Sequence, residues 1–541
     1  MGATNEKRRV TVSRVKTLAT LLFGCLVAAP ALGQINYTTY HYDNLRSGQN
    51  PHETTLTPAV VNVSSFGKLF SQPVDGQVYG APLVVSNVHI PGKGAHNVVY
   101  VATENDSVFA FDANSNTGID AAPLWQVSFI DAAKGITTIP STDVGPTIAI
   151  EPQIGITSTM VINTANSTLY VVSATKENGT YYQRLHALNL TTGAEQLGGP
   201  VVITATVNGS GADSKNGTIT FDPLHSNQRA ALLLLNGVIY IAWSSHGLER
   251  VDPYHGWVMG YDANTLAQTA AFCVTPDGDQ GGIWQSGNGP AADPQGNIYF
   301  MVGNGTFDAD KGRNDFGMSM VKLAPSSGLK VADYFTPFDA AILTQKDWDL
   351  GSGGNLMLPY QNGATEPNLA VGAGKDGNIY LVNRQNMGHF NVKNNSQIVQ
   401  EIRRAFDGHS LYSSPAFWQG NLYFWGVYDT LRVFQVTKGL IGTTPIATSS
   451  YSMASPGATP VVTSNGAENG IVWAVDTSKS LTGPAVLHAL DANNATELYN
   501  STQAGTRDTA GYAVHFTIPT VVNGRVYLGT ATELDVYGLL P

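Results

Sequence analysis

Oxygen-bearing side chains alternate along residues 308–315 (DADKGRND), which is the pattern of calcium-binding loops. Asp308, Asp310 and Asp315 offer carboxylates, the ligands that calcium prefers. The stretch departs from the EF-hand pattern, because Gly312 stands where a third alternate ligand belongs and no Glu closes the loop. Two interpretations stay open: a metal site formed by these three aspartates, or an acidic loop in solvent.

A second polar stretch, residues 244–257 (SSHGLERVDPYHGW), contains His246 and His255. Two histidines can hold a metal or exchange protons, since the imidazole titrates near neutral pH. Their spacing is not a metal-binding signature, so histidines that only hydrogen-bond within a loop are the alternative.

Three further side chains are candidates for ligand binding. Trp284 and Gln285 belong to a Gly-rich segment (WQSGNG), where the backbone can approach a ligand closely. Arg384 follows an apolar run (NIYLVNR) and is interpreted either as a ligand contact or as an ordinary turn residue. The sequence contains no GxSxG, P-loop or HExxH motif, so no catalytic class is identified from motifs.

A repeated unit of three alternating strands must position these loops. Its second strand carries an aromatic or small apolar residue at its centre, and its third strand often ends in a turn rich in Asp, Asn, Thr and Gly. A first strand precedes each pair, and in five copies it begins after a proline, which suits an edge strand. The centres of the eight second strands are Tyr100, Tyr170, Tyr240, Tyr299, Ala370, Tyr423, Trp473 and Tyr527.

Eight such units predict an all-β protein, an eight-bladed β-propeller of four-stranded antiparallel blades. The last unit has no fourth strand of its own, whereas Phe66–Val74 reads as a strand without a unit. We therefore expect Phe66–Val74 to pair with Glu533–Tyr537, so that both chain ends close the ring and no sheet edge stays open.

The chain before the ring divides into two parts. Residues 1–33 combine a basic start, an apolar stretch and small residues at the end, which predicts a cleaved signal peptide and a secreted or periplasmic protein. Residues 34–65 are a polar, turn-rich N-terminal extension, expected to cover one face of the propeller, and residues 66–541 form the propeller itself.

Composition narrows the function classes. The formal charge is −11, and it becomes −15 without residues 1–33, which carry five basic residues against Glu6. Such an acidic chain is a poor partner for nucleic acid, and no later segment is apolar for long enough to span a membrane. Cys273 is the only cysteine beyond the signal peptide, which excludes an internal disulfide and a CxxC metal site in the mature protein.

The opening stretch with Arg46, Leu56-Thr57-Pro58 and Lys68-Leu69-Phe70 resembles that of the pyrroloquinoline-quinone (PQQ) dehydrogenases. The units at 108–125 and 487–491 are similar to the PQQ-type propeller repeat, and the resemblance covers most of residues 40–541. It implies the propeller fold, with PQQ and calcium as cofactors; the residues by themselves establish no cofactor. The chain lacks the family's pair of adjacent cysteines, and no calcium-binding Glu/Asn/Asp set can be matched in it. It also resembles secreted bacterial PQQ-like propeller proteins.

Long insertions gather on one face of the expected propeller, that of the loops joining second to third strands and fourth to first strands. They occur at 130–153, 175–183, 206–230, 244–255, 304–316 and 336–351. We expect a ligand at the axis on this face, among His246, Trp284, Gln285, Asp308, Asp310 and Arg384. The first hypothesis is a non-catalytic protein that binds a small molecule, a glycan or a protein there. The alternative is a PQQ- and calcium-dependent dehydrogenase of an alcohol or sugar, which requires carboxylates and an Arg or Lys to converge on the axis beside a Trp.

Overall fold

The computed structural model describes residues 1–2, 34–145, 150–249, 253–408 and 410–541. The chain divides into two units, Met1–Gln34 and Ile35–Pro541, and the second is the propeller. The signal peptide predicted for residues 1–33 lies outside the described residues apart from Met1 and Gly2. No helix in the described part of the chain is long and apolar enough to cross a membrane.

The first four blades follow one another along the chain, each an antiparallel sheet. Their strands, from the first to the fourth of each blade, are β3 (Leu83–Ile90), β4 (Gly94–Thr103), β5 (Ser107–Asp112) and β6 (Trp125–Ser128); β9 (Val161–Asn163), β10 (Thr168–Glu177), β11 (Thr180–Asn189) and β12 (Val201–Val202); β16 (Leu233–Leu235), β17 (Val238–Ser245), β18 (Trp257–Asp262) and β19 (Gln268–Cys273); and β20 (Ala291–Ala292), β21 (Ile298–Met301), β22 (Met320–Ala324) and β23 (Lys330–Thr336).

The last four blades repeat the pattern and confirm the predicted eight-bladed fold. Their strands are β24 (Leu356–Met357), β25 (Leu369–Ala373), β26 (Ile379–Asn383) and β28 (Gln400–Ile402); β29 (Ala416–Trp418), β30 (Asn421–Trp425), β31 (Asp429–Thr437) and β33 (Ala447–Met453); β34 (Val461–Asn465), β35 (Glu468–Asp476), β36 (Val486–Asp491) and β37 (Glu497–Asn500); and β38 (Thr520–Val522), β39 (Arg525–Gly529), β40 (Glu533–Leu539) and β2 (Phe66–Pro73).

Smaller elements decorate this ring. The loop before blade 2 forms β7 (Ile136–Pro140) and β8 (Gln153–Ile154), and the loop before blade 3 forms the hairpin β13 (Thr206–Asn208) and β14 (Thr218–Thr220), then β15 (Ser226–Asn227). The others are α1 (Ala340–Gln345), β27 (His389–Phe390), β32 (Leu440–Ile441) and β1 (Gln49–Asn50).

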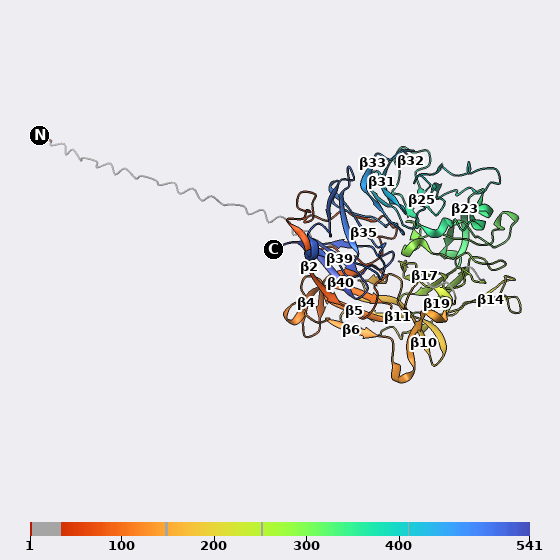
Figure 1. Cartoon of the computed structure of the whole chain (residues 1–541), viewed down its shortest axis with the longest axis horizontal. Helices are drawn as coiled ribbons and strands as arrows, with labels where there is room; N and C mark the ends of the chain where they lie inside the picture. The colour runs from red at the N-terminus through yellow and green to blue at the C-terminus, as the bar shows by residue number, and fades with distance from the viewer. Residues whose placement is uncertain (3–33, 146–149, 250–252, 409) are drawn as a thin grey trace. The chain divides into compact units, whose positions relative to one another are not determined.

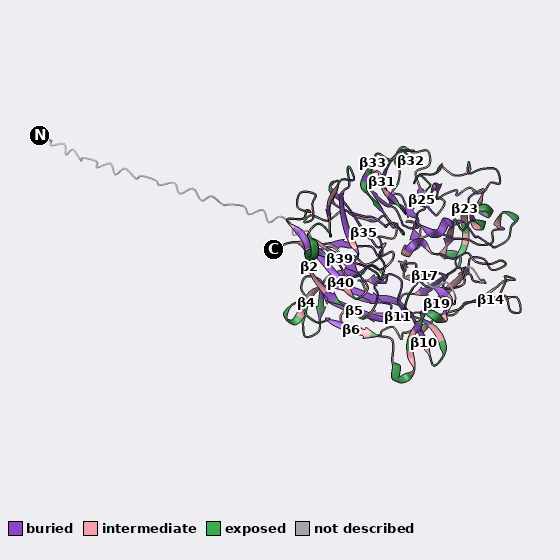
Figure 2. Ribbon diagram, in the orientation of Figure 1, coloured by how far each residue is buried: buried purple, intermediate pink, exposed green. Residues whose placement is uncertain are grey.

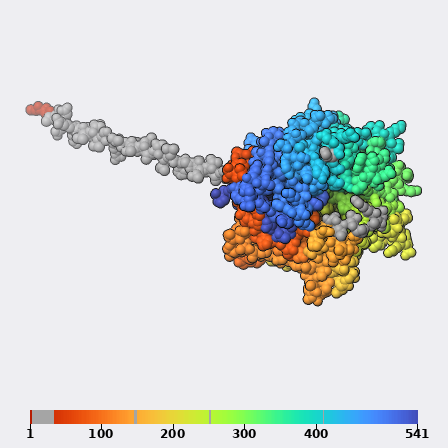
Figure 3. Space-filling model, in the orientation of Figure 1, coloured from red at the N-terminus to blue at the C-terminus, as the bar shows by residue number. Residues whose placement is uncertain are grey.

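The ring closes as predicted, because β2 pairs with β40. Phe66 lies opposite Leu539 and Pro73 lies opposite Glu533, so the fourth strand of blade 8 comes from the N-terminal part of the chain. Figure 1 shows β2 beside β40 and β39, and Figure 3 shows the blades in chain order from orange through green to blue. Pairing both ends in one sheet leaves no open edge between the last blade and the first.

Four of the tyrosines at the centres of the second strands, Tyr100, Tyr170, Tyr423 and Tyr527, donate hydrogen bonds to a neighbouring blade, which gives a reason for this residue to recur in the sequence. The hydroxyl of Tyr100 donates to the carbonyl oxygen of Leu190 in the next blade at 3.0 Å, and that of Tyr423 donates to Ala492 at 2.9 Å. Burial of the aromatic rings and of four fully enclosed tryptophans supplies the core between the sheets, whereas exposed residues gather in turns at the rim (Figure 2).

The N-terminal extension was expected to cover one face of the propeller. Instead, residues 37–48 run along the inner edges of the blades. Their backbone oxygens accept hydrogen bonds from the first strands, or the residues beside them, of six blades, and Tyr37 forms a two-way bridge with Val84 of blade 1. The side chains of Arg46 and Tyr42 donate to carbonyl oxygens of blades 3 and 8. The reason is chemical: the inner strands expose unpaired backbone groups at the axis, and residues 37–48 supply partners for all eight blades. The six backbone acceptors are Tyr37, Thr38, Asn44, Leu45, Ser47 and Gly48.

Candidate axial site

A pocket of about 280 Å³ is formed by loops that enter the first strands or leave the second strands, on the face that carries the long insertions. Aromatic walls and a small number of polar groups are typical of small-molecule sites. The lining residues are Asn227, Arg229, Glu249, Tyr254, Trp284, Ser286, Asn304, Asp347, Asp349, Ser352, Lys375, Tyr412 and Phe516.

Four polar residues from blades 4 and 5 form the centre of the pocket. Lys375 follows β25, and its ammonium group contacts the carboxylate of Asp349 and lies 3.1 Å from that of Asp347. Asn304 follows β21; its backbone N–H donates to Asp349 at 2.6 Å and its side-chain amide donates to Asp347 at 2.7 Å. The network therefore orients two carboxylates, one amide and one ammonium group toward the same space.

Electrostatics keep the lysine charged. Burial by itself would lower the pKa of Lys375, but the carboxylates of Asp349 and Asp347 outweigh it and hold this pKa above its ordinary value. A second cation, Arg229, is buried with its guanidinium 4.2 Å from the ring centre of Phe516. Burial lowers the pKa of Arg229, yet a guanidinium stays protonated in proteins. Two cations and the carboxylates of Glu249, Asp347 and Asp349 thus share one pocket.

Two amide side chains of the pocket have hydrogen-bonding capacity that the protein does not use. Among the described residues, neither polar atom of the Asn227 side chain has a partner, and Asn227 is only 1 % exposed. The Oδ1 atom of Asn304 is buried and likewise without a partner there. Buried amide groups without partners are costly, so these atoms are available to hydrogen-bond to water, a ligand or an ion in the pocket.

Of the ligand-binding candidates from the sequence, Trp284 lines the pocket and the others do not. His246 is buried, and burial together with the charge of Arg229 lowers the pKa of its imidazole to about 3. Both nitrogens of His255 are engaged, by Thr275 at 3.0 Å and Asp213 at 2.9 Å. The structure does not bring the two histidines together as a metal or catalytic pair.

Gln285 and Arg384 are placed elsewhere. Gln285 is fully buried; it accepts from the backbone of Met301 and donates to that of Asn288, so it supports the loop beneath Trp284. Arg384 does not lie on the expected face: it follows β26 whereas Lys375 precedes this strand, so the two residues lie at opposite ends of blade 5.

The three aspartates of the predicted calcium loop stay in the loop between β21 and β22. Asp308 accepts from the backbone N–H of Asp315 at 3.1 Å, and Asp315 accepts from that of Asp277 at 3.0 Å. Burial raises the pKa of Asp315 to about 6, with Asp308 and Asp277 adding to the effect. Asp310 points into another hollow, with Phe338 and Phe390. The loop is folded around backbone donors, and its carboxylates do not form a group of three in the described chain.

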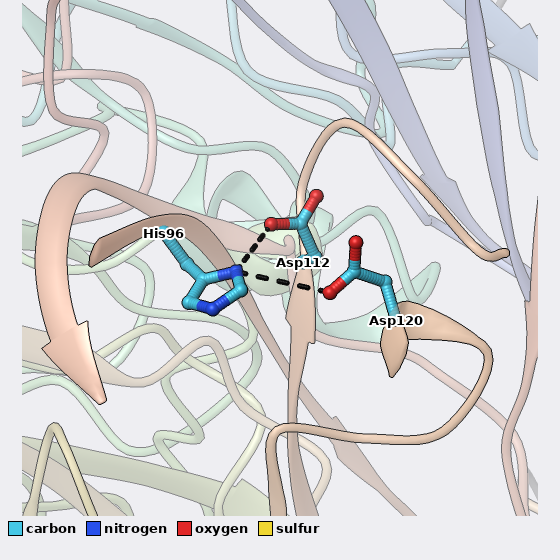
Figure 4. A group of neighbouring side chains, drawn as sticks. All are labelled: His96, Asp112 and Asp120. Carbon is cyan, nitrogen blue, oxygen red and sulfur yellow. Dashed lines mark hydrogen bonds and ion pairs between the residues drawn. The ribbon is translucent and has the colours of Figure 1, made fainter. Parts of the chain in front are cut away.

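One group of three side chains that could ligate a metal does occur among the described residues, in blade 1, near the start of β4 and the end of β5 (Figure 4). His96 Nδ1 lies 2.7 Å from Asp112 and 3.9 Å from Asp120, and Nε2 lies 3.1 Å from the backbone oxygen of Lys93. The hydrogen bond to Asp112 raises the pKa of His96. A protonated imidazole between two carboxylates satisfies this arrangement without an ion.

A larger hollow, about 910 Å³, lies between β19 and β23 on the outer side of blades 3 and 4. It is lined mainly by strand residues, with His389 paired to Asp333 at 3.1 Å and stacked on Tyr334. The axial pocket is the better candidate site, because it lies on the face that carries the long insertions and brings two cations and three carboxylates together.

Sequence reasoning missed Asn304, Asp347, Asp349 and Lys375. The first three lie in the two insertions at 304–316 and 336–351, so loop length was the signal that could have found them. Lys375 follows β25 in a turn, GAGKDG, that resembles any tight turn between strands.

Neither a protein-family model nor a curated protein sequence matches the chain. Solved structures do. A europium-containing methanol dehydrogenase superposes with a TM-score of 0.58 at 14 % identity, over 93 % of this chain and 98 % of the other. The chain has the quinoprotein dehydrogenase fold. The quinohemoprotein alcohol dehydrogenases of Pseudomonas putida HK5 and Comamonas testosteroni each give 0.57 at 14 % identity, over 93 % of this chain and 80 % of theirs.

Proposed function

We propose that the protein binds a small, planar, anionic molecule together with a divalent cation in the axial pocket. The observation that carries this proposal is the convergence of Asn304, Asp349 and Lys375 beside the indole of Trp284. An aromatic face suits a planar ring, an ammonium group suits an anion, and carboxylate and amide oxygens suit a hard cation.

The charges favour such a pair of ligands over either one alone. Three carboxylates against two cations leave an excess of negative charge, which repels a free anion but attracts a cation. Arg229 and Lys375 lie in the same pocket and can then contact the anionic part of a chelated molecule. The amide oxygen of Asn304, which has no partner among the described residues, is free to join the carboxylates as a metal ligand.

PQQ with calcium is the ligand pair that the dehydrogenase neighbours suggest, and the residues present fit it. Trp284 would hold the ring, Arg229 and Lys375 its carboxylates, and Glu249, Asp347 and Asn304 the ion. No cysteine lines the pocket, since Cys273 lies in β19, so a ring of adjacent cysteines is not part of this fit.

The second candidate function, oxidation of an alcohol or sugar, is favoured by the contact between Lys375 and Asp349. Bound PQQ would supply the electron acceptor. On the protein side, Asp349 offers a carboxylate oxygen to the proton of a substrate hydroxyl, and Lys375 stabilises the ionised carboxylate. The aromatic rings of Tyr254, Tyr412 and Phe516 border this space and limit the water that reaches it.

Titration of the purified protein with PQQ, with and without Ca²⁺, tests the proposal through tryptophan fluorescence. We expect a saturable change that needs Ca²⁺, that is lost in Trp284→Phe, and that persists in Trp348→Phe, since Trp348 is 43 % exposed and does not line the pocket. Lys375→Gln is expected to weaken binding at least tenfold. Absence of a saturable change at micromolar PQQ would refute the PQQ proposal.

Dye reduction with a panel of alcohols and sugars separates the two functions. Binding of PQQ without dye reduction would leave the binding function and remove the oxidoreductase. Turnover that Asp349→Asn reduces at least a hundredfold, with PQQ binding retained, would establish the second function.

We also infer that the protein is exported, from the pattern of residues 1–33. Sequencing the N-terminus of the mature protein tests this, and a start near residue 34 is expected. A mature protein that still begins at Met1 would contradict it.

A further inference from the structure

A cavity of about 210 Å³ lies between blades 6 and 7, apart from the axial pocket. Its walls come from β33 of blade 6, from the ends of β35 and β37, and from the loop that leads into β36. The lining residues are Tyr451, Asp476, Ser478, Lys479, Pro484, Val486, His488, Asn500 and Thr502. None of them lines the axial pocket.

His488 is the buried polar group of this cavity. Its side chain is 2 % exposed, and Nδ1 lies 2.7 Å from a carboxylate oxygen of Glu497, so Nδ1 carries the proton and donates. His488 itself lines the cavity, whereas Glu497 does not. Nε2 is buried and has no hydrogen-bond partner among the described residues. This nitrogen can therefore accept a hydrogen bond from a ligand.

Blade 2 contains the same arrangement in a closed form. His186 occupies the same position in the repeat (RLHAL against VLHAL), and its Nδ1 contacts Glu195. Here Nε2 lies 2.9 Å from the hydroxyl of Ser173, and the ring of Phe129 stacks on the imidazole at 3.6 Å. Both nitrogens are thus used and the imidazole is covered.

Two substitutions within the repeat account for the difference. His186 pairs with Val171 and His488 pairs with Ala474, so Asp476 takes the place of Ser173 in its strand. The carboxylate of Asp476 accepts from the hydroxyl of Tyr451 at 2.7 Å and from the backbone of Ser478 at 2.8 Å, instead of contacting the imidazole. Tyr451 replaces Phe129, with its ring 4.6 Å from that of His488 and tilted by 31°.

We propose that this cavity binds a neutral polyhydroxylated molecule, a single sugar unit, with one hydroxyl donating to Nε2 of His488. The ligand must donate to Nε2 and to the carboxylate of Asp476, and must accept from the ammonium group of Lys479. An anion is disfavoured by Asp476 and a cation by Lys479, whereas hydroxyl groups both donate and accept. The cavity volume of about 210 Å³ is about seven times the ~30 Å³ of a water molecule, which leaves room for one sugar ring.

Saturation-transfer difference NMR tests the proposal with D-glucose, D-galactose, D-mannose and N-acetyl-D-glucosamine as probes at millimolar concentration. We expect at least one sugar to receive saturation from the wild-type protein. His488→Gln should reduce that signal at least fivefold. His186→Gln, the matched change in blade 2, should leave it unchanged.

A second variant keeps the test independent of any folding defect in His488→Gln. Asp476→Ser combined with Tyr451→Phe gives blade 7 the closed side chains of blade 2, and the same fivefold loss is expected with the thermal midpoint retained. Three outcomes would overturn the proposal: no signal from any sugar, a signal that both blade 7 variants retain and Trp284→Phe abolishes, or binding of Zn²⁺ in place of sugar that His488→Gln removes.

Discussion

Blades 2 and 7 show how the same repeat can enclose a buried histidine in one blade and leave it beside a cavity in another. Each carries a buried histidine held by a glutamate from the same place in the sequence, but the blade in front contributes different side chains. At the junction of blades 1 and 2, Trp125 and Phe129 fill the space. At the junction of blades 6 and 7, Ala447 pairs with Val433 where Trp125 pairs with Ala110, and Tyr451 is 37 % exposed. The backbone repeat sets where the histidine lies, and the neighbouring fourth strand decides whether it is enclosed.

The largest expected effect concerns Trp125, the side chain that closes the first junction. It is 9 % exposed, its indole N–H donates to Leu190 at 2.9 Å, and Gly193, with φ of 70°, leaves room for the ring. Trp125→Ala is expected to lower the free energy of unfolding by about 3–5 kcal/mol, measured by denaturant unfolding. Trp348→Ala is the control and should change little. A loss below about 1 kcal/mol for Trp125→Ala would show that the junction is not tightly packed.

Ser173 tests how much the hydrogen bond to Nε2 of the enclosed His186 contributes to stability. Ser173→Ala leaves Nε2 of His186 buried without its partner, and we expect a loss of about 1–3 kcal/mol in the free energy of unfolding. Ser478 lines the cavity beside His488, and Ser478→Ala should lower the free energy of unfolding by less than about 0.5 kcal/mol. Equal costs for the two serines would break the comparison.

The tyrosines that join neighbouring blades should act alike at both junctions. Tyr100→Phe and Tyr423→Phe each remove one buried hydrogen bond to a carbonyl oxygen. We expect each to cost about 0.5–1.5 kcal/mol in denaturant unfolding. A cost at one junction only would mean that the blades dock by different means there.

The smallest expected effect is a dependence on pH. Burial lowers the pKa of His186 below its ordinary value, despite the opposing contact with Glu195. A histidine with a lowered pKa in the folded state favours folding when it is neutral. Its contribution is therefore complete above pH about 6.5 and declines as the pH falls below that value. Wild-type protein should lose more stability than His186→Gln between pH 7.5 and 5.5; equal losses would contradict the assignment.

Much of the ring could be predicted because its signals are local. The eight centres from Tyr100 to Tyr527 all lie in second strands, and the five prolines each precede a first strand. Alternating apolar and polar side chains define a strand, and turn residues define its ends. Both signals extend over only a few residues, so they can be recognised in the sequence alone. The partner of β2 was predictable too, since a missing strand at one end matched a spare strand at the other.

The candidate site could be predicted only in part. Trp284 was selected because its segment is rich in glycine, and loop lengths selected the face on which the axial pocket lies. His255 and Gln285 were selected for their chemistry, but Thr275, Asp213 and Met301 already engage them. A sequence shows that a side chain can bind a ligand and does not show that the protein itself has used that capacity.

The sequence by itself determined the number of blades, the order of their strands and the closure of the ring, because hydrophobic alternation and turn chemistry depend on near neighbours. The tertiary structure alone decided that residues 37–48 run along the inner edges, since their partners are eight separate strands. It also decided that Asn304, Asp349 and Lys375 meet at the axis, because the ring of blades brings distant loops to one point. The surroundings of His488 likewise depend on tertiary structure, because Tyr451, which packs beside it, belongs to a strand more than thirty residues away in the chain.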